Sequence, residues 1–265
     1  MVGVLVVAKQ RSGTNFLRGL ISSAGKIIDF GEVFQPSETE GRWKYDTWRE
    51  EFEEKTPVTY VDSVDHSFRY LSYLEEGGVT PCLDVKYNSL LRTIGIWYSP
   101  ADIPPILMAA IRKKYLIIHL QRKNLMEHAV STLVAQRSGV YVATSEEQVS
   151  RVGKVTISAD AALRVTQQYN REVFLINYWI RRARENYPML RFRNIEYEAL
   201  TSASQEELER IIGDILRTCE VPMTRHIQPK TQKIIKDWRE SVENAKEIEA
   251  AYSDLMASET EQGAK

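Results

Sequence analysis

A basic loop rich in hydroxyl groups follows the first apolar run of the chain. Arg11, Ser12, Gly13 and Thr14 come after residues 2–7 and directly before a segment with helical periodicity. In a parallel sheet such a junction lies at the carboxyl edge, where these sheets bind ligands. Free backbone N–H groups and the positive helix end favour an anion there, and glycine lets the backbone come close. The loop predicts a phosphate site, although Ser12 as a plain helix cap beside a solvated Arg11 is the simpler alternative.

A second candidate anion site follows the strand predicted at residues 115–120. Arg122 leaves this strand just before a helix that begins near Asn124, and Ser131 lies nearly two turns inside that helix. The planar, permanently charged Arg122 fork and the Ser131 hydroxyl suit a monoester phosphate. Lys123 is eight residues from Ser131 and Arg122 is nine, so either could be the ligand. We favour Arg122, and the alternative for Ser131 is an ordinary surface serine.

Together the two segments resemble the nucleotide motifs of the sulfotransferases that use 3′-phosphoadenosine 5′-phosphosulfate (PAPS). The K/R-S-G-[ST] loop after the first strand resembles their 5′-phosphosulfate loop, and an Arg followed by a helical Ser resembles their 3′-phosphate motif. The resemblance implies PAPS as donor, 3′-phosphoadenosine 5′-phosphate (PAP) as product and no metal. The residues that it assigns to the donor are Arg11, Ser12, Gly13, Thr14, Asn15, Arg122 and Ser131. Arg11 would also stabilise the charge that develops on the leaving phosphate.

Transfer to an alcohol also needs a group that accepts the hydroxyl proton. In the cytosolic enzymes of animals a His follows two residues after a strand-end Lys, whereas the segment LDVKYN has Lys86 and then Asn88. Asn cannot act as a base. The segment DFGEVFQP resembles the GE-x-F segment of bacterial carbohydrate sulfotransferases of the trehalose and nodulation-factor type. This resemblance implies that Glu32 is the catalytic base, assisted by Arg11. Lys86, at the end of its strand, could contact the sulfuryl oxygens or the substrate. By residue type alone, Glu32 and Lys86 could equally be surface charges.

Other side chains near these motifs are predicted to pack. His119 and His128 are favoured as packing or surface residues over catalytic ones. Five aromatic residues could offer flat faces to a sugar, but ordinary packing is favoured for them as well. They are Trp43, Tyr45, Trp48, Trp97 and Tyr98.

The elements that must position these residues alternate between strand and helix. Apolar runs rich in Val and Ile recur at residues 2–7, 26–30, 82–85, 115–120 and 190–195. Helical periodicity marks residues 13–24, a segment from 124, and residues 158–187 and 205–219. The pattern predicts an α/β fold with three layers, a mainly parallel five-stranded sheet flanked by helices. The resemblance implies that this is the P-loop-like sulfotransferase fold. Residues 35–80 carry no specific signal.

Composition limits the class of protein. The 265 residues are 43 % hydrophobic and hold no linker-like stretch, so we expect one domain over 1–256 and a flexible tail at 257–265. Thirty-five basic and 36 acidic residues leave a net charge of −1, which argues against nucleic acid as a partner. Cys82 and Cys219 have no disulfide or zinc spacing. The apolar start is too short for a membrane span and lacks the features of a signal peptide, so we expect a cytoplasmic protein without an integral membrane segment.

The sequence therefore predicts a sulfotransferase that acts on a small-molecule or glycan hydroxyl, and it is compatible with a homodimer. One alternative is a nucleotide-dependent phosphotransferase with a divergent phosphate loop. No Lys follows Gly13, so the GxxxxGK[ST] pattern of nucleoside triphosphatases is missing. The other alternative is a catalytically silent nucleotide-binding protein.

Overall fold

The computed structural model describes residues 2–35, 41, 43–55, 62–92, 102–141, 154–227 and 237–263. They form two compact units. The first comprises Met1–Gln121 with Leu175–Pro229, and the second Arg122–Phe174 with Lys230–Lys265. The assignment of one domain over 1–256 stays a prediction.

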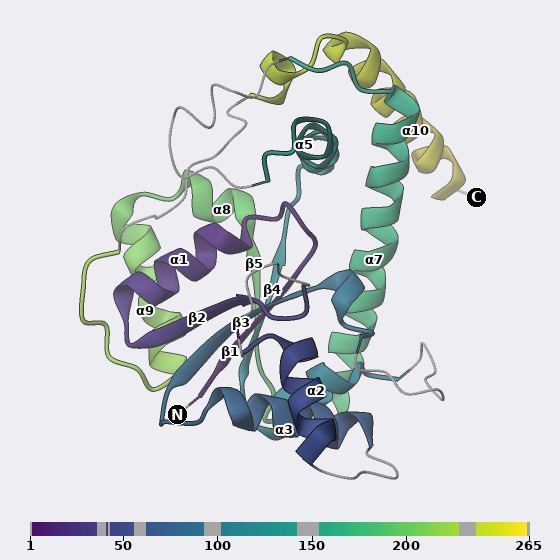
Figure 1. Ribbon diagram of the computed structural model, residues 1–265. Coiled ribbons are helices and arrows are strands. Elements are labelled where there is room, and N and C mark those ends of the chain that lie inside the picture. Colours follow the sequence, from purple (N-terminus) through teal and green to yellow (C-terminus); the bar gives the residue numbers. More distant parts are fainter. Residues whose placement is uncertain are drawn as a thin grey trace. The chain divides into compact units, whose positions relative to one another are not determined.

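The first unit is built on a parallel sheet (Figure 1). Its five strands lie in the order β2-β3-β1-β4-β5, and every neighbouring pair is parallel. They are β1 (Val4–Ala8), β2 (Ile27–Glu32), β3 (Thr80–Lys86), β4 (Leu116–Gln121) and β5 (Arg191–Glu196). Every residue of β1 and β3 is buried, which explains why the sequence shows continuous apolar runs rather than alternation. The predicted parallel, five-stranded α/β fold is confirmed.

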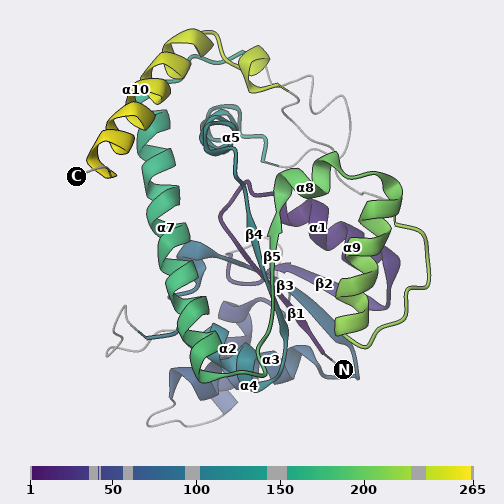
Figure 2. The same cartoon turned by 180° about the vertical axis from the view of Figure 1, so that it is seen from behind.

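Helices cover both faces of this sheet (Figure 2). One side carries α1 (Thr14–Ala24), α8 (Tyr197–Ser202) and α9 (Gln205–Thr218), and the other carries α3 (Ser63–Leu74) and α4 (Pro105–Arg112). The unit also holds α2 (Tyr45–Lys55), a short 3-10 helix at Tyr87–Ser89 and the last part of α7 (Ala159–Asn186). The predicted starts and ends of α1, α7 and α9 agree with these bounds to within one residue.

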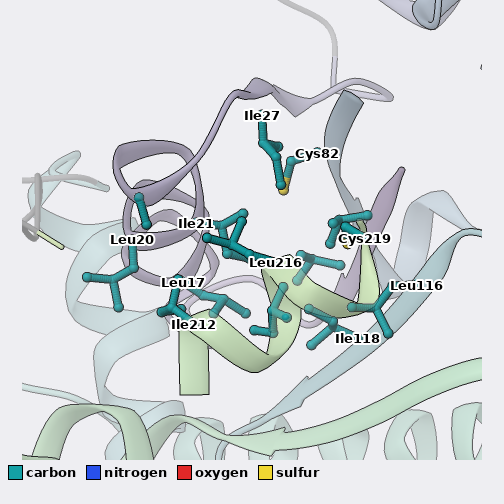
Figure 3. Packing of buried hydrophobic residues seen from close by; sticks show 14 of the residues in the cluster. Leu17, Leu20, Ile21, Ile27, Cys82, Leu116, Ile118, Ile212, Leu216 and Cys219 are labelled. Atoms are coloured by element: carbon teal, nitrogen blue, oxygen red, sulfur yellow. The ribbon is translucent and has the colours of Figure 1, made fainter. Parts of the chain in front are cut away.

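Alternate strand residues pack against α1 and α9 (Figure 3). Leu17 and Ile21 of α1 meet Ile212 and Leu216 of α9 over the sheet. Both cysteines are free thiols buried in this core. The packed layer fixes the direction of α1, and therefore the position of the loop that precedes it.

The second unit has its own apolar core. Its elements are α5 (Leu125–Ser138), the first part of α7, a 3-10 helix at Trp238–Ser241 and α10 (Ala245–Gly263). The core residues are Met126, Ala129, Val130, Val134, Ile157, Ala162, Trp238, Val242 and Ile248. Helix α10 continues through residues 257–263, for which the sequence predicted a flexible tail. Among the described helices of the whole chain, none is both long and apolar enough to cross a bilayer.

Candidate functional site

The loop between β1 and α1 has an unusual backbone. Arg11 has a φ of 67° and Gly13 a φ of 83°, both in the left-handed region. Gly13 is the N-cap of α1 and the helix start has no side-chain cap, so Ser12 is not the plain helix cap of the simpler alternative. Ser12 is fully buried, and its Oγ has no hydrogen-bond partner among the described residues. A buried hydroxyl left unpaired costs about 1–3 kcal/mol, so this atom is a candidate ligand contact.

The Tyr197 ring packs against Gly13 of this loop. Tyr197 is the first residue of α8, directly after β5. A Cβ added to Gly13 would lie 2.2 Å from Cδ2 of Tyr197. Gly13 is therefore required both by its φ and by the ring packed against it.

Three of the predicted site residues meet around one ammonium group. Lys86 Nζ donates to Thr14 Oγ1 at 2.6 Å and to Asp84 Oδ2 at 2.8 Å, and it lies 3.3 Å from Glu32 Oε1. Thr14, Asp84 and Lys86 are all buried, whereas the Glu32 side chain is 31 % exposed. The structure thus brings Glu32 and Lys86 to the start of α1, with the Glu32 carboxylate reaching solvent.

A β-bulge aims Glu32 into this cluster. The register of β2 against β3 shifts between Asp29 and Gly31, and Glu32 is then paired with Asp84. Gly31 has a φ of 70°, and its N–H donates to Asp29 Oδ1 at 2.9 Å. Bulges re-aim side chains next to functional sites. Here the bulge sets which face of the sheet receives the Glu32 carboxylate.

Arg18 ties the bulge to the first turn of α1, and the sequence interpretation missed it. Its guanidinium forms an ion pair with Asp29, donates to Asn15 Oδ1, and places Nε 3.4 Å from Asp84 Oδ2. Burial alone would lower the pKa of Arg18, but the carboxylates of Asp84 and Asp29 together raise it above its ordinary value. A signal was present, because Arg18 lies among the apolar positions of the amphipathic helix. There a charge needs buried partners.

Two further contacts surround the cluster. Lys44 Nζ donates to the backbone oxygen of Glu32 at 2.8 Å, and burial lowers the pKa of Lys44 although Glu32 opposes this effect. Gln10 Nε2 donates to Asn88 Oδ1 at 2.9 Å. Asn88 therefore lies beside the loop that carries Gln10.

In the second unit, Arg122 and Ser131 are both buried, so Ser131 is not the surface serine of the alternative. Arg122 Nη2 forms an ion pair with Glu127 Oε1 at 2.7 Å, and the Arg122 N–H donates to the Tyr169 hydroxyl at 2.8 Å. Asn124 caps α5, since its Oδ1 accepts from the Glu127 N–H at 3.0 Å. The Arg122 side chain thus points back to the helix start. That Arg122 and Ser131 bind a phosphate stays a prediction.

The two histidines have packing environments. His119 is buried in β4, with Nε2 2.7 Å from the Tyr87 hydroxyl and Nδ1 2.9 Å from the Gln121 amide nitrogen. Burial lowers the pKa of His119 to about 4, so its imidazole is neutral near pH 7. His128 stacks on Tyr169 with ring centroids 4.4 Å apart.

The aromatic residues are divided between core and surface. Tyr45 and Trp48 are buried with their ring centroids 6.0 Å apart, so they belong to the core rather than to a sugar-binding face. Trp43 is 44 % exposed. Trp97 and Tyr98 lie outside the described residues.

The first unit is therefore an α/β structure with a parallel sheet and with buried polar groups at the carboxyl end of its first strand. No family model matches the chain, and the search of curated proteins finds no match. Among solved structures it is similar to a sulfotransferase from Alicyclobacillus acidocaldarius, with 13 % identity, a TM-score of 0.44, and coverage of 97 % of this chain and 95 % of that one. It is also similar to the sulfotransferase domain from the curacin biosynthetic pathway, with 12 % identity, a TM-score of 0.46, and coverage of 89 % and 81 %.

Proposed function

We propose that this chain is a sulfotransferase that moves the sulfuryl group of PAPS to a hydroxyl of a carbohydrate or another small acceptor in the cytoplasm. The observation that carries the proposal is the buried, unpartnered Ser12 Oγ in a loop where Arg11 and Gly13 have left-handed backbone. This loop lies between a central parallel strand and a helix N-terminus, which is an environment suited to an anion. Its K/R-S-G-[ST] pattern is the one that the sulfotransferases share.

In this proposal the donor is held by two sets of groups. The 5′-phosphosulfate is assigned to the loop, through backbone N–H groups and the hydroxyls of Ser12 and Thr14. The 3′-phosphate is assigned to Arg122 and Ser131, on the basis of their motif and of the burial of both side chains.

The proposed chemistry is in-line transfer. Glu32 accepts the proton of the acceptor hydroxyl while its oxygen forms the new bond to sulfur. The bond between sulfur and the bridging phosphate oxygen breaks, and its electron pair stays on PAP. Arg11 and the N-terminus of α1 stabilise the charge that develops on that phosphate. Preorganised donors of this kind supply most of the rate enhancement in comparable group transfers.

Thermal unfolding with two nucleotides tests the donor assignment. PAP should raise the melting temperature strongly, because ligand at about a hundredfold over its Kd adds roughly 2.7 kcal/mol. Adenosine 5′-monophosphate, which lacks the 3′-phosphate, should raise it much less. Equal stabilisation by both nucleotides would contradict the role of Arg122 and Ser131.

A transfer screen with PAPS against a panel of glycans and small alcohols then tests the reaction. Sulfated product from any acceptor supports the enzyme assignment. Binding of PAP without transfer to any acceptor would identify the silent binding protein, and magnesium-dependent turnover of ATP would identify the phosphotransferase.

A further inference from the structure

The ammonium group of Lys86 lies where oxygen atoms from three different elements converge. Thr14 contributes a hydroxyl from the first turn of α1, Asp84 a carboxylate from β3, and Glu32 a carboxylate from the end of β2. The distances from Nζ are 2.6, 2.8 and 3.3 Å. Lys86 itself is 2 % exposed, so its charge is largely shielded from water.

Two of these oxygen donors correspond to the magnesium ligands of another class of enzyme. In P-loop nucleoside triphosphatases, Mg²⁺ is held by the Ser or Thr of the phosphate loop and by an Asp of the Walker B strand. In this chain Thr14 is the last residue of the K/R-S-G-[ST] loop, and Asp84 belongs to β3, where it is paired with Val6 of β1. A hydroxyl and two carboxylates are the oxygen ligands that hard divalent cations prefer.

We propose that the Lys86 ammonium takes the place of a divalent cation, so that the positive charge beside the phosphosulfate loop is covalently fixed to the chain. Distances of 2.6 and 2.8 Å are those of charge-assisted hydrogen bonds, and Mg²⁺ would require about 2.0–2.1 Å. Arg18 Nε lies 3.4 Å from Asp84 Oδ2 and helps to balance the charge of the Asp84 carboxylate. The inference deepens the proposed function, on which its link to sulfuryl transfer rests. The cation replacement itself does not depend on that function.

The cluster leaves an atom that could bind a metal if the lysine were removed. Asp84 Oδ1 is buried and has no hydrogen-bond partner among the described residues. With the amine gone, Asp84, Glu32 and Thr14 would surround a space whose two carboxylates have lost the Lys86 charge and are balanced in part by Arg18, with its Nε 3.4 Å from Asp84 Oδ2. Removing the lysine partner of the buried Asp84 carboxylate is destabilising, so a divalent cation should bind between Asp84 and Glu32.

Binding of Mn²⁺, measured by electron paramagnetic resonance, tests the proposal. The wild-type protein should take up no Mn²⁺ at this cluster, whereas Lys86→Ala should bind it stoichiometrically. Adding Asp84→Asn to Lys86→Ala should abolish the binding. Lys44→Ala is the matched control and should bind no Mn²⁺, because Lys44 Nζ donates to the backbone oxygen of Glu32 at 2.8 Å and its removal leaves Lys86 in place.

Stability supplies the second measurement. Lys86→Ala should melt at a lower temperature than the wild type, and Mn²⁺ should recover part of the difference. The wild-type melting temperature should not respond to Mn²⁺. If Lys86→Ala neither binds Mn²⁺ nor is stabilised by it, or if the wild type binds Mn²⁺ with Asp84 as a ligand, the proposal is wrong. No PAPS is used in these measurements, so a failure of sulfuryl transfer would overturn the proposed function alone.

Discussion

The Tyr197 ring lies against the backbone of Gly13, so close that any side chain at Gly13 would overlap it. An added Cβ would come within 2.2 Å of Cδ2 and 2.3 Å of Cε2 of that ring. Since Gly13 also has a φ of 83°, two independent constraints exclude other residues at the start of α1. The loop is thereby coupled to the end of β5, on which α8 directly follows.

Replacing Gly13 by Ala should therefore destabilise the protein and weaken PAP binding. Gly77→Ala is a matched control, because Gly77 has a φ of 81° and nothing within 4 Å of an added Cβ. The control should cost only the left-handed conformation, about 1–2 kcal/mol. Urea unfolding and calorimetry with PAP check both effects. Equal losses of stability in the two variants would show that the Tyr197 contact is unimportant.

Glu32→Gln should remove the proposed base while leaving the donor bound. Gln is similar in size and can form hydrogen bonds, but it cannot accept a proton at neutral pH. We expect kcat to fall by about 10²- to 10⁴-fold with little change in PAP affinity. Glu50→Gln, at an exposed position of α2, should retain wild-type kcat. Near-normal turnover of Glu32→Gln with a true acceptor would assign Glu32 a structural role.

Arg122→Ala should weaken PAP binding about ten- to hundredfold, because a charge-assisted contact contributes about 1.5–3 kcal/mol. Lys123→Ala should change it little. The Arg122 variant should also lose stability, since it leaves the largely buried Glu127 carboxylate without its ion pair. Isothermal calorimetry measures the PAP affinity of both variants. The opposite ranking would mean that Lys123 binds the 3′-phosphate.

His119 should make the protein less stable in mild acid. Burial lowers its pKa from 6.5 to about 4, so between these values the unfolded chain binds a proton that the folded chain does not. Neutral, buried His119 contributes about 3 kcal/mol to the free energy of unfolding. This contribution is complete above about pH 6.5 and is lost as the pH falls to about 4. In urea unfolding over this range, His119→Gln should show a shallower pH dependence than the wild type. Identical profiles for His119→Gln and wild type would refute the assignment.

The sheet could be predicted because its strands are buried on both faces and so appear as apolar runs. Helix α1 was equally clear, since its apolar stripe ends at Gly25. By contrast, α2 and α3 were not recognised. Helix α2 buries only Tyr45 and Trp48 of its residues, so its pattern is too polar to stand out. The sequence does hold a signal for the start of α3, namely Asp62, which caps the helix by accepting from the N–H groups of Val64 and Asp65.

The candidate site was predicted less completely than the fold. Glu32 and Lys86 were found through a resemblance, but their contact depends on the register of β2 against β3 and on the bulge before Gly31. Gly31 is a weak signal of a bulge, because an isolated glycine in a strand often marks one, but the register shift itself cannot be read from the sequence. Asp84 was missed for the same reason. Its carboxylate becomes significant only when the sheet places it beside Arg18 and Lys86.

The left-handed backbone of Arg11 has a consequence for attempts to engineer this protein. Among the described residues other than glycine, φ is positive at Arg11, Lys114 and Glu220, with values of 67°, 60° and 60°. Glycine would relieve the steric cost of the left-handed conformation, about 1–2 kcal/mol at each position, offset in part by the larger entropy that it gives the unfolded chain. A library sorted for heat resistance alone should therefore accumulate glycine at all of them. At the exposed turn residues Lys114 and Glu220 this exchange should leave catalysis intact. Arg11→Gly would raise thermostability but lower turnover, so such a library must also be sorted for activity.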